Sequence, residues 1–298
     1  MSFSGIAALI GNPLYYPEGR SFAAILGATP SKGARSPVLW NAAFNAQGVD
    51  AQMLPMDIPV ERLDQLLSAL EANPKFLGGA IAMPYKEATT QWLGEQLTPE
   101  AKAIGAVNCL YRDASGRLMG SNTDGEGALV SFEARFGTLT GRNVLLVGPG
   151  GAGKAVAAYL ARAVGSKGHL TIGSRAKIDH ARLGAASWVQ WDDIATVLPA
   201  VDVLVNCTSI GAAAQIGQSP LSSEQLAKLP VNAIVFDIIY QPSPTVLLQL
   251  ANERGLQTLD GMAMNREQAV LAYSRAAPQI LGSAVTRAAM EEAKKKLD

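Results

Sequence analysis

Apolar runs of strand length alternate with segments of helical pattern along most of the chain. In the first half these runs cover residues 22–26, 51–56, 77–83 and 107–111, and in the second half residues 143–147, 169–173, 201–206, 233–237 and 256–259. A further short strand is predicted around residues 188–191. In residues 59–72 leucines recur instead at helical spacing, on one face. Strands that alternate with helices predict an α/β fold with largely parallel sheets.

Local signals place several helix starts. Ser36-Pro37 is typical of an N-cap followed by a proline in the first turn, and it predicts a helix that runs to residue 47. Pro84 and Pro99 open further helices, and the chain has a helical pattern from Gly261 to its end. A length of 298 residues suggests two domains, and we expect the C-terminal helices to pack back on the first of them.

Composition excludes several classes of function. The chain is 48% hydrophobic and carries 25 basic and 25 acidic residues, so no basic surplus indicates a nucleic-acid partner. No run approaches the ~20 apolar residues of a membrane span, and the N-terminus does not resemble a signal peptide. Cys109 and Cys207 lie in separate apolar segments and are interpreted as buried thiols of a cytoplasmic protein. His169 and His180 form no cluster with metal-ligand spacing, so we expect no metal.

The strongest chemical signal is the pattern Gly148-x-Gly150-x-x-Gly153. It follows the apolar run 143–147 and precedes a helical segment of small residues, which is the context in which such glycines predict dinucleotide binding. One glycine makes the tight turn, one lets the backbone approach the pyrophosphate, and one lets the helix pack on the strand. The phosphates would then face unpaired N–H groups at the helix start. The alternative is an ordinary βα loop that binds no ligand.

Seven short motifs stand in order between Phe22 and about Ala272. They are Pro84-Tyr-Lys86, Gly105-Ala-Val-Asn108, Ser121-Asn-Thr-Asp-Gly125, Gly148–Ala155, Asn206-Cys-Thr-Ser-Ile-Gly211, Asp237-Ile-Ile-Tyr-x-Pro242 and Gly261–Ala269. In this order and spacing the chain resembles the shikimate dehydrogenase family.

The resemblance implies that Lys86 and Asp124 are catalytic. Such a pair can bind a substrate hydroxyl and move its proton while hydride leaves carbon. Which of the two takes the proton stays open, because a carboxylate neighbour favours charged lysine whereas desolvation favours the neutral amine. Taken singly, Lys86 is typical of a solvated first-turn lysine and Asp124 of a turn former. The resemblance also implies substrate contacts for residues that could otherwise cap backbone or pack, namely Ser36, Asn108, Tyr240 and Gln268.

The cofactor implied by the resemblance is NADP. After the run 169–173 the chain reads Ser174-Arg175-Ala-Lys177, without an acidic residue before Asp179. An arginine there suits the 2′-phosphate of NADP, whereas an acid would suit the ribose hydroxyl of NAD. The alternative is a surface ion pair between Arg175 and Asp179. The cofactor contacts predicted are Gly148, Gly150, Gly151, Ala152, Gly153, Ser174, Arg175, Thr208, Ser209 and Gly261.

The chain departs from the family on the substrate side. Ala34 stands in place of the first serine of a Ser-x-Ser-Pro element that holds the substrate carboxylate, and the loop from Gly27 is one residue longer. Ala80-Ile-Ala82 replaces Asn-Val-Thr, and Trp40 replaces a histidine. A site that lacks donors for a hydroxyl discriminates poorly for it, so the substrate is less well predicted than the redox chemistry. Ser31 is a candidate substitute donor.

These observations predict a two-domain α/β oxidoreductase. We expect an N-terminal α/β substrate domain of residues 1–123 and 261–298, and an NADP-binding Rossmann domain of residues 124–260 with a doubly wound parallel sheet. The substrate is expected in the cleft between them, at the carboxyl ends of the strands.

The expected reaction is reversible NADP-dependent hydride transfer between shikimate and 3-dehydroshikimate or a close analogue, as in the shikimate pathway of aromatic amino acid biosynthesis. The alternatives are a quinate or aminoshikimate dehydrogenase, a folate-type dehydrogenase, and a non-catalytic nucleotide-binding regulatory module. We expect a cytoplasmic monomer or homodimer whose partner is a small cyclic hydroxy acid, with no nucleic acid and no membrane.

Overall fold

The computed structural model describes residues 2–212, 215–278 and 280–297. The chain folds into two compact units, one made of Met1–Thr123 and Ala269–Asp298 and the other of Asp124–Gln268. The expected nucleotide domain ended at residue 260, just before helix α11 (Gly261–Ala276), whereas the boundary between the two units falls inside that helix. Each unit is an α/β structure, so the predicted fold class is confirmed.

The first unit is built on a sheet with the order β2-β1-β3-β4-β5. Strands β1 (Ser21–Gly27), β2 (Ala51–Asp57) and β3 (Phe76–Ile81) are parallel, whereas β4 (Cys109–Arg112) and β5 (Leu118–Ser121) pair antiparallel. The sequence pattern did not predict β5. The link between β4 and β5 is too short for a parallel crossover, so the two strands can only form a hairpin.

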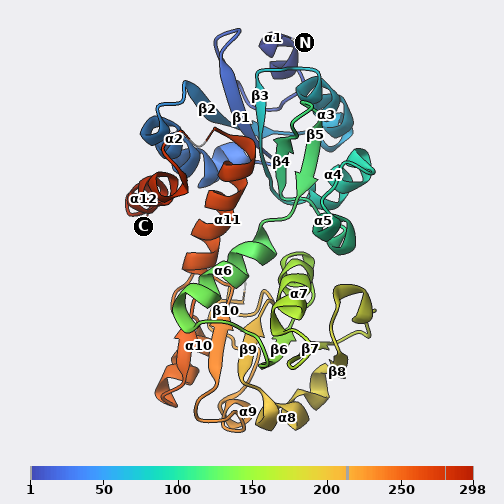
Figure 1. Cartoon of the computed structure of the whole chain (residues 1–298), viewed down its shortest axis with the longest axis vertical. Helices are drawn as coiled ribbons and strands as arrows, with labels where there is room; N and C mark the ends of the chain where they lie inside the picture. Colours follow the sequence, from blue (N-terminus) through green and yellow to red (C-terminus); the bar gives the residue numbers. More distant parts are fainter. Residues whose placement is uncertain (1, 213–214, 279, 298) are drawn as a thin grey trace. The chain divides into compact units, whose positions relative to one another are not determined.

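Alternate residues along β1 pack into two cores. Phe22, Ala24 and Leu26 join the core under α1 (Phe3–Ala7), α3 (Leu63–Glu71), α4 (Lys86–Leu93) and α5 (Pro99–Ile104). Ala23 and Ile25 face the opposite core, which contains residues of α2 (Ser36–Gln47), the end of α11, and α12 (Ser283–Lys294). The two groups of helices lie on opposite faces of this sheet (Figure 1).

One local prediction in this unit was wrong. Arg35, not Ser36, occupies the N-cap position of α2, so Ser36 and Pro37 are the first two helical residues. The side chain of Arg35 makes no capping hydrogen bond to the amides at this helix start. Ser36 therefore has helical backbone geometry and does not act as the N-cap.

The second unit, as far as the structure describes it, has six strands in the order β11-β10-β9-β6-β7-β8, and all of them are parallel. Their bounds are β6 (Asn143–Val147), β7 (His169–Ser174), β8 (Ser187–Gln190), β9 (Val203–Asn206), β10 (Ile234–Asp237) and β11 (Gln257–Leu259). The chain order reverses between β6 and β9, which is the switch point where doubly wound sheets bind their ligands.

Both faces of this sheet are covered by helices. Val144 and Leu146 belong to the core with α6 (Asp124–Phe136) and α7 (Gly151–Val164), while Leu145 and Val147 belong to the core with α8 (Ile194–Val197), α9 (Ser223–Leu226) and α10 (Val246–Glu253). Burial on both faces explains why the central strands β6, β9 and β10 are nearly continuous apolar runs. Short 3₁₀-helices are η1 (Pro30–Lys32), η2 (Val60–Arg62), η3 (Ala181–Leu183), η4 (Trp191–Asp193) and η5 (Leu198–Ala200). In the described part of the chain no helix is both long and apolar enough to cross a membrane.

Candidate active site

Two of the glycines in the turn after β6 are required by packing. Gly148 has a φ of 87°, and a Cβ there would lie 2.5 Å from Cγ2 of Thr208. A Cβ on Gly153 would lie 2.1 Å from the Gly148 carbonyl oxygen. A side chain at either position would force apart the turn, helix α7 and the end of β9, so these residues set the close approach of strand and helix.

The remaining two glycines of the turn face open space. No heavy atom of the described residues lies within 4 Å of a Cβ built on Gly150 or Gly151. Gly150 is the N-cap of α7, and no side chain of the described residues bonds the first amides of the helix, which are those of Gly151, Ala152 and Gly153. These amide N–H groups are available to a ligand, no side chain shields the backbone at the two glycines, and the helix dipole is positive at this end. All three properties favour a bound pyrophosphate, so these residues fit a dinucleotide.

The loops after β9 and β10 are fixed by a buried polar network. Asn206 Nδ2 donates to Asp237 Oδ1 over 3.0 Å, and Asn206 Oδ1 accepts from the Thr208 amide (2.9 Å) and hydroxyl (2.7 Å). Asp237 also accepts from the Ile239 amide and the Thr245 hydroxyl. Burial raises the pKa of Asp237 above its ordinary value, while these hydrogen bonds act in the opposite direction. The network places Thr208 against Gly148 at the switch point.

Both cysteines are buried, and among the described residues neither forms a disulfide, as predicted. Cys207 follows Asn206, and its Cβ lies 3.1 Å from the position that a Cβ on Gly153 would take. Burial raises the pKa of the Cys207 thiol well above its ordinary value, and the nearby Asp237 adds to the effect. A buried thiol packs as a small apolar side chain, and Cys207 is a packing residue of the glycine turn.

The turn after β7 presents Arg175. Trp188 Nε1 donates to Ser174 Oγ (2.8 Å), which donates to the Ala176 carbonyl (2.6 Å), and Gln190 Nε2 donates to the Arg175 carbonyl (2.9 Å). These bonds fix the backbone and leave the Arg175 side chain exposed. In the described residues no ion pair joins Arg175 to Asp179, which instead accepts a hydrogen bond from the Arg182 amide.

In the first unit, Lys86 and Asn108 lie at the carboxyl edge of β1 and β3. The Val107 amide donates to the Lys86 carbonyl (3.1 Å), which joins the start of α4 to the entry of β4. Asn108 Oδ1 accepts from the amide of Thr123 (2.7 Å) and from its hydroxyl (3.3 Å). Lys86 is half-buried and Asn108 is buried. The carbonyl end of Asn108 thus holds the backbone that leads directly to Asp124.

A cavity of about 300 Å³ lies at the same edge of this sheet. Its walls are the loop of residues 27–34, with Ile25, Ala82 and Met83. Ala34 and Ala82 line it, whereas Ala80 packs against the hydrophobic core. Ser31, the candidate substitute donor, bonds Asp57 through both its amide (2.9 Å) and its hydroxyl (2.5 Å). The hydroxyl of Ser31 therefore already donates its hydrogen bond to Asp57.

Four predicted site residues belong to the second unit, apart from the cofactor turns. Asp124 is the first residue of α6, and Tyr240 is 36% exposed beyond the end of β10. Gln268 Nε2 donates to the Asn265 carbonyl within α11 (3.1 Å). A Cβ on Gly261 would lie 2.0 Å from the Ile238 carbonyl oxygen, so α11 begins directly against the loop after β10. Ser36, in the first unit, is half-buried at the start of α2.

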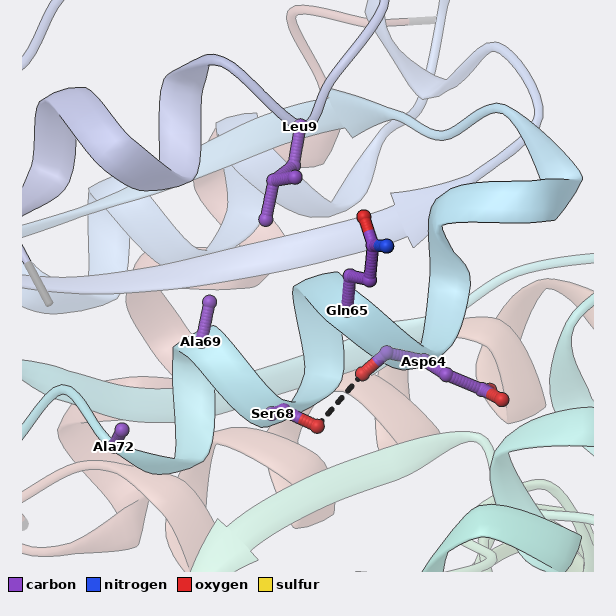
Figure 2. Close-up of a pocket in the computed structure, with 6 residues that line it drawn as sticks. All are labelled: Leu9, Asp64, Gln65, Ser68, Ala69 and Ala72. Carbon is purple, nitrogen blue, oxygen red and sulfur yellow. Dashed lines mark hydrogen bonds between the residues drawn. The ribbon is translucent and has the colours of Figure 1, made fainter.

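A second hollow in the first unit offers no comparable chemistry. This hollow of about 510 Å³ is lined by Leu9, by residues of α3 and by Ala72, which follows that helix (Figure 2). Its polar groups are Asp64, Gln65 and Ser68, and the Ser68 hydroxyl donates to the Asp64 carbonyl (2.8 Å). None of the predicted site residues lines it. Among the described residues no group of three His, Cys, Asp or Glu side chains could hold a metal ion.

The polar network of Asn206, Asp237 and Thr245 was not predicted as part of the site. The signal was a polar residue at the end of each of two neighbouring apolar runs, residues 201–206 and 233–237. Carboxyl ends of adjacent parallel strands meet at one edge, so such residues are brought together. The strand order, which makes β9 and β10 neighbours, was needed to recognise this.

Comparison with known proteins gives a consistent match. Residues 26–110 match the family model described as the shikimate dehydrogenase substrate binding domain. A shikimate dehydrogenase (NADP(+)) from Thermosynechococcus vestitus is 36% identical over 275 residues, which cover 89% of this chain and 93% of that protein.

Solved structures agree with this match. The shikimate 5-dehydrogenase from Thermus thermophilus, in complex with NADP(H) and shikimate, is 28% identical with a TM-score of 0.75, and the match covers 92% of this chain and 99% of that one. The ligand-free 5-ketofructose reductase of a Gluconobacter species is 27% identical with a TM-score of 0.76, at the same coverages.

Proposed function

Since the chain belongs to the shikimate dehydrogenase family, we propose that it catalyses reversible NADP-dependent hydride transfer between shikimate and 3-dehydroshikimate or a close analogue. It is an oxidoreductase of the type that serves the shikimate pathway and aromatic amino acid biosynthesis. The folate-type alternative is set aside, because the family match covers most of the chain.

The observation that carries this proposal is the hydrogen-bonded set of Lys86, Asn108 and Thr123. Val107 bonds the Lys86 carbonyl, and Asn108 bonds both polar groups of Thr123, so three separate motifs are held at one edge of the first sheet. Thr123 is followed directly by Asp124. An ammonium, an amide and a carboxylate in this order supply the groups that a hydroxyl needs for binding and for proton movement.

We assign the proton transfer to Lys86 and Asp124 acting on the hydroxyl that becomes a ketone. Asn108 and Gln268 would hold further hydroxyls of the ring, and Ser36 and Tyr240 would bind near its carboxylate. NADP, when bound, accepts or supplies the hydride. The remaining task of these residues is to orient the ring and to hold the proton at the reacting oxygen.

The residues of the second unit would hold the cofactor. Gly148, Gly150 and the first-turn amides of Gly151, Ala152 and Gly153 would receive the pyrophosphate, with Thr208, Ser209 and Gly261 beside it. Exposed Arg175 would pair with the 2′-phosphate, while Ser174 fixes the turn that carries it. The absence of an ion pair to Asp179 in the described residues favours this role over a surface ion pair.

The substrate side supports a second candidate within the same chemistry. Ala34 and Ala82 line the cavity at the carboxyl edge of the first sheet, so hydroxyl donors that the family carries are missing. Quinate and aminoshikimate are the nearest alternatives. The likeness to a 5-ketofructose reductase adds a polyhydroxy ketone without a carboxylate to the compounds to be tested.

The test is a substrate screen with both cofactors. Reduction of NADP and NAD is followed with shikimate, quinate and aminoshikimate, and oxidation of NADPH with 5-ketofructose. We expect the highest kcat/KM with shikimate and NADP. Binding of NADP without turnover of any of these compounds would instead favour the non-catalytic module. The protein is further proposed to act in the cytoplasm as a monomer or homodimer, which gel filtration with light scattering would decide.

A further inference from the structure

The cavity of the first unit contains one charged residue among the described residues that line it, Lys32. The rest of the lining is apolar or small, with Thr29 as the one further polar side chain in this described part. A volume of about 300 Å³ is at the lower end of small-molecule sites and suits a ligand of one ring. Because few other polar groups line the cavity, the Lys32 ammonium would be the main binding partner of an anionic ligand there.

Nothing in the described residues neutralises this lysine. Lys32 is exposed and makes no ion pair there, and the nearby carboxylate, Asp57, takes hydrogen bonds from Ser31 instead. No acidic residue of the described ranges lines the cavity. The flexible four-carbon stem of a lysine lets its ammonium follow a ligand group across a space of this size.

The start of helix α2 adds to the positive potential at this wall. Ala34 lines the cavity, Arg35 is the N-cap and Ser36 the first helical residue, and the Arg35 side chain makes no capping hydrogen bond to the amides there. The 12-residue helix therefore directs the positive end of its dipole toward the wall that Ala34 forms. The hydroxyl that would bind an anion at position 34 is absent, but two other sources of positive potential flank the position.

We propose that Lys32 is the specificity-determining residue that binds the substrate carboxylate, in place of a serine hydroxyl at position 34. This inference rests on the proposed function, because it takes the ligand to be a cyclic hydroxy acid. Recognition by charge makes binding sensitive to ionic strength. It also makes the enzyme selective for the carboxylate and tolerant of changes on the ring face toward Ala34 and Ala82.

The test compares Lys32→Met with a matched control, Lys75→Met. Lys75 is also an exposed lysine of the first unit, but it precedes β3 and so lies at the opposite edge of the sheet. Dissociation constants are measured by calorimetry for shikimate and for its neutral methyl ester, and KM and kcat are measured with saturating NADP. Melting temperatures establish that each variant is folded.

We expect Lys32→Met to weaken shikimate about tenfold, the low end for a hydrogen bond between charged groups, and to leave the methyl ester within about twofold. Lys32→Arg should retain most of the affinity, and Lys75→Met should behave as wild type. In wild type, added salt should weaken shikimate more than it does in Lys32→Met.

Two outcomes overturn the assignment in different ways. Shikimate affinity that is equal in Lys32→Met and wild type, or a loss of the same size for the methyl ester, shows that Lys32 does not bind the carboxylate. Wild-type protein that neither binds nor oxidises shikimate overturns the proposed function and this assignment with it.

Discussion

The substitution Asn206→Asp tests the buried network that holds the loops of the nucleotide site. The change keeps the shape of the side chain and both acceptor bonds to Thr208. It replaces the N–H that donates to Asp237 with an oxygen, which puts two carboxylates about 3.0 Å apart in a fully buried site. Like charges at this distance cannot both ionise, so the pair keeps a proton and its upper pKa rises strongly.

The sign of the effect on stability follows from this proton. The pKa of the pair is raised in the folded state above its unfolded value, so stability is retained at low pH and lost as pH rises through the raised pKa. One such proton changes the free energy of unfolding by up to ~1.4 kcal/mol per pH unit. Between about pH 5 and about pH 7 the variant should therefore lose roughly 2–3 kcal/mol in total, which is more than wild type loses. Wild type has a smaller loss of the same sign, because burial already raises the pKa of Asp237.

The assay is urea unfolding over this pH range, with hydrogen exchange of peptides from β9 and β10 as the local measurement. The control is the double variant Asn206→Asp/Asp237→Asn, which exchanges acid and amide and leaves a single carboxylate. It should recover most of the loss at neutral pH. A difference between Asn206→Asp and wild type that does not change with pH would refute the reasoning.

Three further predictions concern the reaction. Lys86→Ala should abolish turnover with little change in melting temperature, because the residue serves chemistry at a half-buried site; turnover within threefold of wild type, in a steady-state assay, excludes it from the mechanism. Asp124→Asn should lower kcat far more than NADP affinity, and loss of NADP binding with normal turnover at saturation would contradict this. Arg175→Ala should raise the KM for NADP about tenfold by removing a charge-assisted contact while leaving NAD nearly unchanged. Equal kcat/KM for NADP in this variant and wild type would remove Arg175 from the phosphate site.

The second sheet could be predicted almost strand by strand from the sequence, since its central strands β6, β9 and β10 are buried on both faces. In β6 the four residues 144–147 are all apolar and buried, so this run has no polar position that could make it ambiguous. The first sheet was harder. Strand β5 contains Gly120 and Ser121 and is short, so local pattern does not distinguish it from a loop. Its pairing with β4 depends on the short hairpin link.

Helix α2 shows a different limit. Ser36-Pro37 has the chemistry of a helix start, but the preceding Arg35 already has helical backbone angles. The helix therefore begins one residue earlier than the pattern predicts, and Ser36 does not take the N-cap position that serine prefers. The candidate site was predictable where it depends on glycines and family motifs. The role proposed for Lys32 was not predictable, because the sequence does not show that this loop lysine lines a cavity.

The C-terminal helices have a consequence for how the protein is made. Gln47 Nε2 donates to the Gly282 carbonyl, 235 positions further along the chain, and Tyr273 and Met290 belong to the same core as Trp40 and Phe44. During synthesis the aromatic face of α2 therefore stays uncovered until the ribosome has made the chain past residue 290. Residues 124–268 have their own core and can fold meanwhile. Folding of the second unit can thus be complete while the apolar residues of α2 are still exposed to solvent.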